Sequence, residues 1–293
     1  FDSRTEAVMR WQGERESSNV EDRRGMGGRR AGFGLGTIVI AVIAAWLFGV
    51  DPRMIMGVLE GVDTMTGSST QQQGPAPAPT DETGRFVSVV LASTEDVWSK
   101  AFQQAGHTYQ PPKLVLYSGR IDTACGLGAA ASGPFYCPGD QRLYIDLSFF
   151  QLMRERLGAP GDFAQAYVVA HEVGHHVQNL LGTMEQMERA RARVSEQQYN
   201  ALSVRLELQA DCYAGVWANH SQQARNWLEK GDIEEGMGAA SAVGDDRIQK
   251  QSQGVVVPET FTHGSSAQRV RWFRTGLESG RASQCDTFSA RTL

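Results

Sequence analysis

The stretch Tyr167-Val-Val-Ala-His-Glu-Val-Gly-His-His-Val-Gln-Asn-Leu-Leu181 carries the pattern that decides the fold of this chain. From Asp162 onward its apolar residues recur at intervals of three and four, which predicts a helix over 162–181. Gly182 follows at the position where a left-handed residue commonly ends a helix. Because apolar residues flank the polar ones on both sides, we expect this helix to be largely buried.

His171 and His175 lie one helical turn apart and therefore project from one face of the predicted helix. Two imidazoles in that arrangement can bind one zinc ion. Glu172 can reach a water at the metal and act as general base. A polar helix face without metal is the alternative, but burying two unpaired histidines and a glutamate would be costly. His176 lies about 140° round the helix from His171 and so cannot bind the same metal ion. We expect it to have a structural role or to hydrogen-bond one of the metal ligands.

A hydrolytic zinc site usually has three protein ligands and one open position, so another element should supply the third ligand. Ser195-x-x-Gln198 is a capping-box pattern that predicts a second long helix running to about Asn219. Glu207 flanks the apolar stripe of that helix and is the predicted ligand; an exposed glutamate with a surface role is the alternative. Asp211 lies one turn further, where its carboxylate can accept a hydrogen bond from a ligating histidine.

Residues 86–293 are expected to form one α+β domain, mostly helical with a small sheet. The segments 113–117 and 142–146 are predicted strands, with glycine-rich turns between them. Helix starts are predicted at Ser93 and at Ser148.

The N-terminal part of the chain has the pattern of a membrane anchor. Residues 31–50 contain no charged side chain and are long enough to cross a bilayer as a helix. A cluster of four arginines lies just before this stretch, at 23, 24, 29 and 30. It predicts a cytoplasmic polar tail at residues 1–30 and a domain on the periplasmic or extracellular side of the inner membrane. Residues 51–85 are expected to be a linker, rich in proline towards its end. A cleaved signal peptide is the competing interpretation.

The four cysteines all follow the predicted span, and an even number in an oxidising compartment favours disulfides. Sequence order leaves their pairing open; the shortest-loop pairing joins Cys125 to Cys137 and leaves Cys212 to pair with Cys285. Structural zinc ligation by cysteine is the alternative, but no CxxC spacing supports it. The net charge of −5 gives no reason to expect nucleic-acid binding.

The histidine motif and the segment Arg205-Leu-Glu-Leu-Gln-Ala-Asp-Cys-Tyr-Ala-Gly-Val-Trp-Ala218 together resemble the bacterial neutral zinc metallopeptidase family. The likeness covers nearly the whole chain. It extends through Met9-Arg-Trp-Gln-Gly13, Asn19-Val-Glu-Asp-Arg-Arg-Gly25, Cys125-Gly126, Pro134-Phe-Tyr-Cys-Pro138, Gly244-Asp-Asp-Arg247 and Phe261-Thr-His-Gly-Ser265. The resemblance implies a zincin-like fold and a gluzincin-type site. Such a site has zinc ligands at His171, His175 and Glu207, and a base at Glu172.

Attack on a peptide carbonyl builds negative charge on oxygen, which calls for a hydrogen-bond donor besides the metal. His263 is the predicted donor, with Tyr144 and Tyr167 as rivals. The alternative is that His263 only shapes the turn before a helix that opens at Ser265.

Other polar residues are expected to have structural or surface roles. Asp245 and Asp246 suggest a second metal, but helix-end groups or ion pairs with Arg247 are the preferred interpretation. His107 and His220 are expected at the surface.

The sequence therefore predicts a membrane-anchored zinc metallopeptidase that acts on protein or peptide substrates. A non-catalytic, membrane-tethered zinc domain that binds other envelope proteins is the alternative. Glu172 argues against it, because a purely structural site needs no base beside an open metal position. An enzyme held latent until a partner opens its cleft is a third possibility.

Overall fold

The computed structural model describes residues 9–25, 76–129, 133–229 and 231–293. The predicted membrane span at residues 31–50 lies outside these ranges, as does most of the predicted linker. Among the described residues, no helix combines the length and apolar character needed to cross a bilayer.

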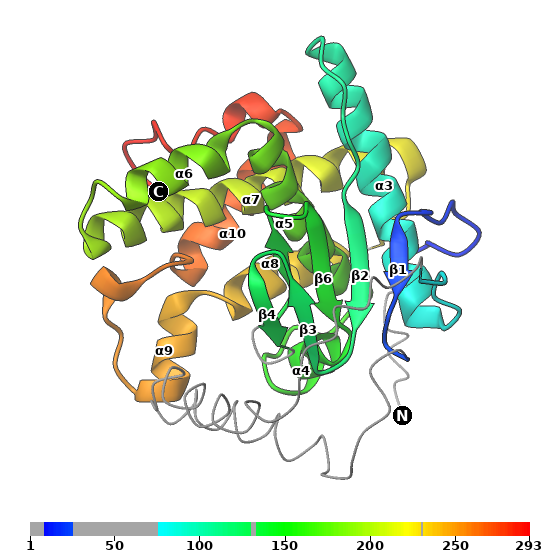
Figure 1. The fold of residues 1–293 in the computed structure, drawn as a ribbon, viewed down its shortest axis with the longest axis horizontal. Coiled ribbons are helices and arrows are strands. Elements are labelled where there is room, and N and C mark those ends of the chain that lie inside the picture. The colour runs from blue at the N-terminus through cyan, green and yellow to red at the C-terminus, as the bar shows by residue number, and fades with distance from the viewer. Residues whose placement is uncertain (1–8, 26–75, 130–132, 230) are drawn as a thin grey trace, which may run out of the picture.

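A four-stranded mixed sheet forms the centre of the molecule, in the order β1-β2-β6-β5 (Figure 1). Strand β2 (Lys113–Tyr117) and strand β6 (Arg142–Asp146) match the predicted strands residue for residue. They pair in parallel, β1 (Val20–Asp22) lies parallel on the outer side of β2, and β5 (Phe135–Cys137) runs antiparallel at the opposite edge.

The two faces of the sheet are covered differently because side chains alternate along each strand. Leu114 and Leu116 point into the main core that the helices complete. Val115, Tyr117 and Tyr144 point the other way, into a small second core. Partly buried Ile121 of strand β3 (Arg120–Thr123) packs against that core.

Three helices build the site, and α5 (Asp162–Leu180) lies against the sheet at β5 and β6. Helix α7 (Glu196–Arg225) packs on α5, and α10 (Ser266–Ser279) packs on α7. The remaining elements are α3 (Glu82–Gln104), β3 (Arg120–Thr123), β4 (Gly126–Ala129), α4 (Ser148–Glu155), α6 (Thr183–Arg191), α8 (Asp232–Ala242), α9 (Asp245–Gln253) and the 3-10 turns Pro258–Thr260 and Ala282–Gln284. The domain is mostly helical with a small mixed sheet, as the sequence predicts.

Local signals account for the ends of the two central helices. Gly182 follows α5 with φ of 80°. Ser195 and Gln198 form the predicted capping box of α7. That helix runs past the predicted end at Asn219 to Arg225.

One of the two further predicted helix starts is wrong. Helix α3 begins at Glu82, where Asp81 caps it by accepting from the Gly84 amide. Ser93 lies in the middle of this helix, where its buried hydroxyl accepts from the Trp217 indole. The start predicted at Ser148 is confirmed, because α4 (Ser148–Glu155) begins at this residue, although Leu147 and not Ser148 occupies the N-cap.

The prediction that residues 1–30 form a polar tail apart from the domain is wrong for residues 9–25. Met9 and Trp11 are buried in the main core, and β1 belongs to the central sheet. The sequence pattern does not indicate this packing, because the apolar residues of the segment are few and widely spaced and show no helical or strand periodicity. The domain boundary at residue 86 is also too late, since α3 has begun by then.

Two disulfides hold the domain and leave no described cysteine free. Cys125 pairs with Cys137 and ties the β3–β4 hairpin to β5. Cys212 pairs with Cys285 and ties the C-terminal segment to α7.

Candidate metal centre

The crossing of α5 and α7 brings the predicted ligands together. His171 and His175 lie on the face of α5 that meets α7, and Glu207 comes from α7. Gly174 permits this close approach, because a Cβ there would lie 3.0 Å from the Ala210 carbonyl oxygen and 3.1 Å from its Cα. Its place in the motif is therefore explained by helix packing, which the spacing of the histidines alone does not show.

The three side chains converge on one point. His171 Nε2 lies 3.2 Å from Glu207 Oε2, and His175 Nε2 lies 3.4 Å from Glu207 Oε1. One ligand atom from each residue lies within 4.8 Å of the other two. Two imidazole nitrogens and a carboxylate are the donor set of a catalytic zinc site, so these residues fit a zinc ion.

The Nδ1 nitrogen of each ligand histidine lies beside a side-chain oxygen that fixes the orientation of the imidazole ring. Asp211 Oδ1 lies 2.9 Å from His171 Nδ1, as expected for a residue behind the ligands. Gln178 Oε1 lies 2.8 Å from His175 Nδ1. Both histidines therefore present Nε2 to the centre. Gln178 was missed by the sequence analysis, although its position three residues after His175 places it on the same helix face.

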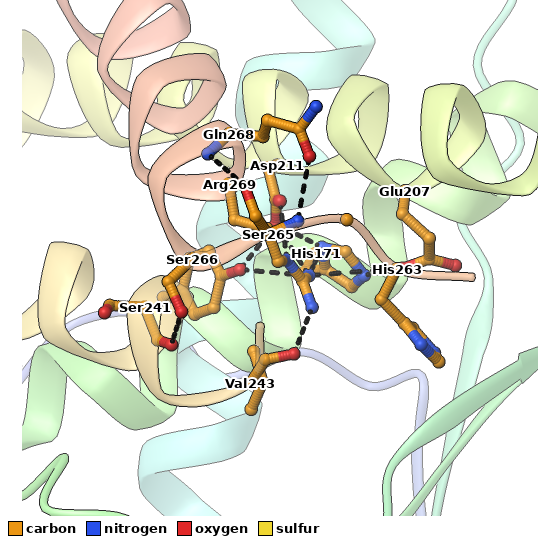
Figure 2. Close-up of polar contacts among 12 residues, drawn as sticks. His171, Glu207, Asp211, Ser241, Val243, His263, Ser265, Ser266, Gln268 and Arg269 are labelled. Carbon is orange, nitrogen blue, oxygen red and sulfur yellow. Dashed lines mark hydrogen bonds and ion pairs between the residues drawn. The ribbon is translucent and has the colours of Figure 1, made fainter. Parts of the chain in front are cut away.

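Arg269 of α10 is a further buried partner that the sequence did not indicate (Figure 2). Its Nε lies 2.8 Å from Asp211 Oδ2 and its Nη2 lies 2.9 Å from Asp211 Oδ1. The Tyr167 hydroxyl also donates to Asp211. This use of its hydroxyl removes Tyr167 from the rivals to His263, because its proton is directed away from the metal ligands.

The charges of the centre depend on one another. Burial opposes ionisation of Glu207, but the two histidines outweigh it and hold the pKa of this carboxyl well below its ordinary value. Burial also opposes the charge on His171; hydrogen bonding to Asp211 and the negative charges of Asp211 and Glu207 raise its pKa to about 10. A cation at this point would replace the proton that His171 otherwise keeps.

Glu172 lies beside the ligands and is buried. Burial raises its pKa above the ordinary glutamate value, and the neighbouring histidines limit that rise. A carboxylate with a raised pKa is a better proton acceptor at neutral pH than an ordinary glutamate.

His263 lies at the rim of the centre on the turn before α10 and projects on the side of Glu207 (Figure 2). Asp245 Oδ2 accepts from the backbone amides of Thr262, His263 and Gly264, and Asp245 Oδ1 lies 3.2 Å from His263 Nδ1. The imidazole of His263 is 52% exposed.

The remaining polar residues have structural partners. Asp246 accepts from the backbone and the hydroxyl of Ser266, which joins the start of α9 to the start of α10. The Tyr144 hydroxyl donates to Asp140.

The other histidines lie outside the centre. His176 is fully buried between the Tyr136 hydroxyl and the Gln110 carbonyl, away from the ligands. His107 is exposed, whereas His220 is only partly exposed and bonds the Gly280 carbonyl.

Comparison with known proteins adds to this geometry. The sequence profile of the family described as "Putative neutral zinc metallopeptidase" matches residues 9–288. The uncharacterized protein YpfJ of Escherichia coli strain K12 is 50% identical over 290 residues, covering 96% of this chain and 99% of that protein. The uncharacterized protein Rv2575 of Mycobacterium tuberculosis is 41% identical over 261 residues, covering 85% and 86%. No solved structure matches the chain.

The profile spans the N-terminal strand, both ligand helices and the turn that carries His263. The ligand residues His171, His175 and Glu207 fall within the matched range and converge in space. The chain therefore belongs to the neutral zinc metallopeptidase family.

Proposed function

We propose that this protein is a zinc metallopeptidase that hydrolyses peptide bonds in protein or peptide substrates, with His171, His175 and Glu207 as ligands. The observation that carries the proposal is the convergence of two Nε2 atoms and one carboxylate beside the buried Glu172. Three protein ligands leave a tetrahedral ion one open position, whereas structural zinc sites usually have four protein ligands.

A bound zinc ion would act as a Lewis acid and lower the pKa of a water to about 7. Glu172 takes the proton of the attacking water and passes it to the leaving amine. His263, held at Nδ1 by Asp245, donates from its other nitrogen to the carbonyl oxygen as negative charge develops there. Asp211 and Gln178 keep the ligand histidines in orientation throughout.

The proposed location is the outer side of the cytoplasmic membrane. Two disulfides favour an oxidising compartment, since cytosolic thiols are kept reduced. The uncharged stretch at residues 31–50 has the length and composition to associate with a bilayer.

The test compares Glu172→Gln with Glu185→Gln, a matched change at an exposed position of α6. The full chain, purified in detergent with zinc, is assayed on an unfolded protein and on a mixed peptide library. We expect Glu172→Gln to keep one zinc per chain by metal analysis and to lose about 100-fold or more in kcat. Glu185→Gln should behave as wild type.

Equal cleavage by Glu172→Gln and wild type would refute the assigned base. A zinc-loaded wild type that cleaves nothing would favour the non-catalytic binding domain. If limited proteolysis or addition of a membrane extract then restored cleavage, the latent enzyme would be favoured instead.

A further inference from the structure

The N-terminal segment Met9–Gly25 is built into the domain along its whole length. Met9 is fully buried, and the Arg10 amide donates to the Trp227 carbonyl. The Trp11 ring meets Phe86 edge-on at 5.5 Å between centroids. These contacts place the segment against α3 and the end of α7.

Hydrogen bonds and ion pairs also join the segment to α3 and α7. Glu95 of α3 accepts from Arg15, from the Ser17 hydroxyl at 2.5 Å and from the Asn19 side chain at 2.8 Å. Arg225 at the end of α7 pairs with Glu14. A segment with both buried apolar residues and partnered charges is part of the fold.

Strand β1 then completes the sheet. It pairs in parallel with β2 over three residues, with Glu21 opposite Val115. The Leu114 amide donates to the Asn19 carbonyl, and the Arg23 amide donates to the Leu116 carbonyl. The match to the family profile begins at residue 9, so the segment is also part of the domain that defines the family.

The chain leaves the domain and returns to it at one place. The Asp22 amide donates to the Pro77 carbonyl at 2.8 Å. The Arg24 guanidinium pairs with both Asp22 and Asp81, the latter being the cap of α3. Residues 25 and 76 are thus held at the same edge of the domain, whatever path residues 26–75 follow.

This arrangement conflicts with a single crossing by residues 31–50. One crossing would put Met9–Gly25 and the metal centre on opposite faces of a membrane, where β1 could not pair with β2. A second crossing in the return segment would have to carry Asp51, Arg53, Glu60 and Asp63 through or beside the lipid, which is costly.

The arginines that predict a cytoplasmic N-terminus are also partly accounted for by the fold. Arg23 pairs with Glu21, and Arg24 pairs with Asp22 and Asp81. Charges that are neutralised by partners in the domain are weak evidence for the side of the membrane on which they lie.

We infer that residues 9–25 lie on the same face of the membrane as the metal centre, docked on their own domain. This inference does not depend on peptidase activity.

The test uses exposed positions in the full chain, expressed in bacterial cells. Arg10→Cys reports the N-terminal segment, and Glu185→Cys on α6 reports the domain. The native cysteines are paired in disulfides and do not react. A membrane-impermeant maleimide is applied to intact spheroplasts and to permeabilised ones.

We expect both variants to be labelled to the same extent in intact spheroplasts. Labelling of Glu185→Cys in intact spheroplasts, with Arg10→Cys labelled only after permeabilisation, would overturn the inference. If both react only after permeabilisation, the two parts still share one face, but the proposed outer location fails. The two proposals are thereby separated.

A cross-link then tests the docking itself. The Arg10 side chain pairs with Glu229, so Arg10→Cys combined with Glu229→Cys should be joined within one chain by a short thiol cross-linker. Arg10→Cys with Glu185→Cys is the control pair, because Arg10 bonds Trp227 just beyond the end of α7, and α6 lies away from that end of α7 (Figure 1). A cross-linked dimer, or no reaction above the control, would overturn docking within the chain. Bound zinc, measured in each variant, verifies that the domain is folded.

Discussion

Replacing Asp211 with alanine tests whether the buried network behind the ligands supports both the fold and the metal. The Asp211 side chain is fully buried and accepts hydrogen bonds from the Tyr167 hydroxyl, His171 Nδ1 and two nitrogens of Arg269. Alanine removes the acceptor for all of these donors. The most costly consequence is at the Arg269 guanidinium, which stays buried without its closest partner charge, while Glu207 remains 4.0 Å away.

The magnitude follows from the environment. Removing one partner of a buried ion pair lowers the free energy of unfolding by about 3–5 kcal/mol. The whole free energy of unfolding of a folded domain is roughly 5–15 kcal/mol. Zinc affinity should fall by about 10–100-fold, because the Nδ1 nitrogen of His171 loses its fixed partner. Adding Arg269→Met removes the uncompensated charge, so the double variant should be more stable than Asp211→Ala alone.

The assay is urea unfolding followed by tryptophan fluorescence, with disulfides oxidised and EDTA present so that metal binding does not contribute. Zinc affinity is measured separately by competition with a chelator. A loss below about 1 kcal/mol for Asp211→Ala would refute the reasoning, since it is smaller than the cost of one unsatisfied buried group. Additive effects of Asp211→Ala and Arg269→Met would refute the coupling between them.

Three further predictions follow from other contacts. Trp11→Ala should lower the free energy of unfolding by about 3–5 kcal/mol in the same urea assay, and a loss near zero would show that the segment is not docked. Because the pKa of His171 rises from 6.5 to about 10, its stabilising effect in the metal-free protein is complete below pH 6.5 and is lost as pH rises through 10. Zinc added at pH 8 should therefore release about two protons, one from His171 and one from a zinc-bound water with a pKa of about 7, detectable by calorimetry in buffers of different ionisation enthalpy, whereas release of only one proton would contradict the pKa of His171. Replacing both Cys212 and Cys285 with alanine removes a disulfide between residues 73 positions apart. If the disulfide stabilises by restricting the unfolded chain, the free energy of unfolding should fall by about 4 kcal/mol, and a urea midpoint equal to that of wild type would contradict this.

Much of the secondary structure follows from local chemistry. The strands at 113–117 and 142–146, helix α5 and the capping box at Ser195 depend on residues within a few positions of one another. The start predicted at Ser93 failed because Ser-x-x-Asp is a common local pattern. The hydroxyl of Ser93 instead bonds a tryptophan 124 residues away, so its role depends on tertiary packing.

The sequence by itself determined that His171, Glu172 and His175 share one region of a buried helix, because a period of 3.6 residues fixes which side chains lie together. It also indicated Glu207 and Asp211 as candidates on a second helix. Only the tertiary structure decided how α7 crosses α5 at Gly174, that Arg269 neutralises Asp211 from 58 residues away, and that Asp245 orients His263. It also placed residues 9–25 within the domain. Contacts between distant segments depend on how whole helices and strands pack, and no local spacing in the chain encodes that packing.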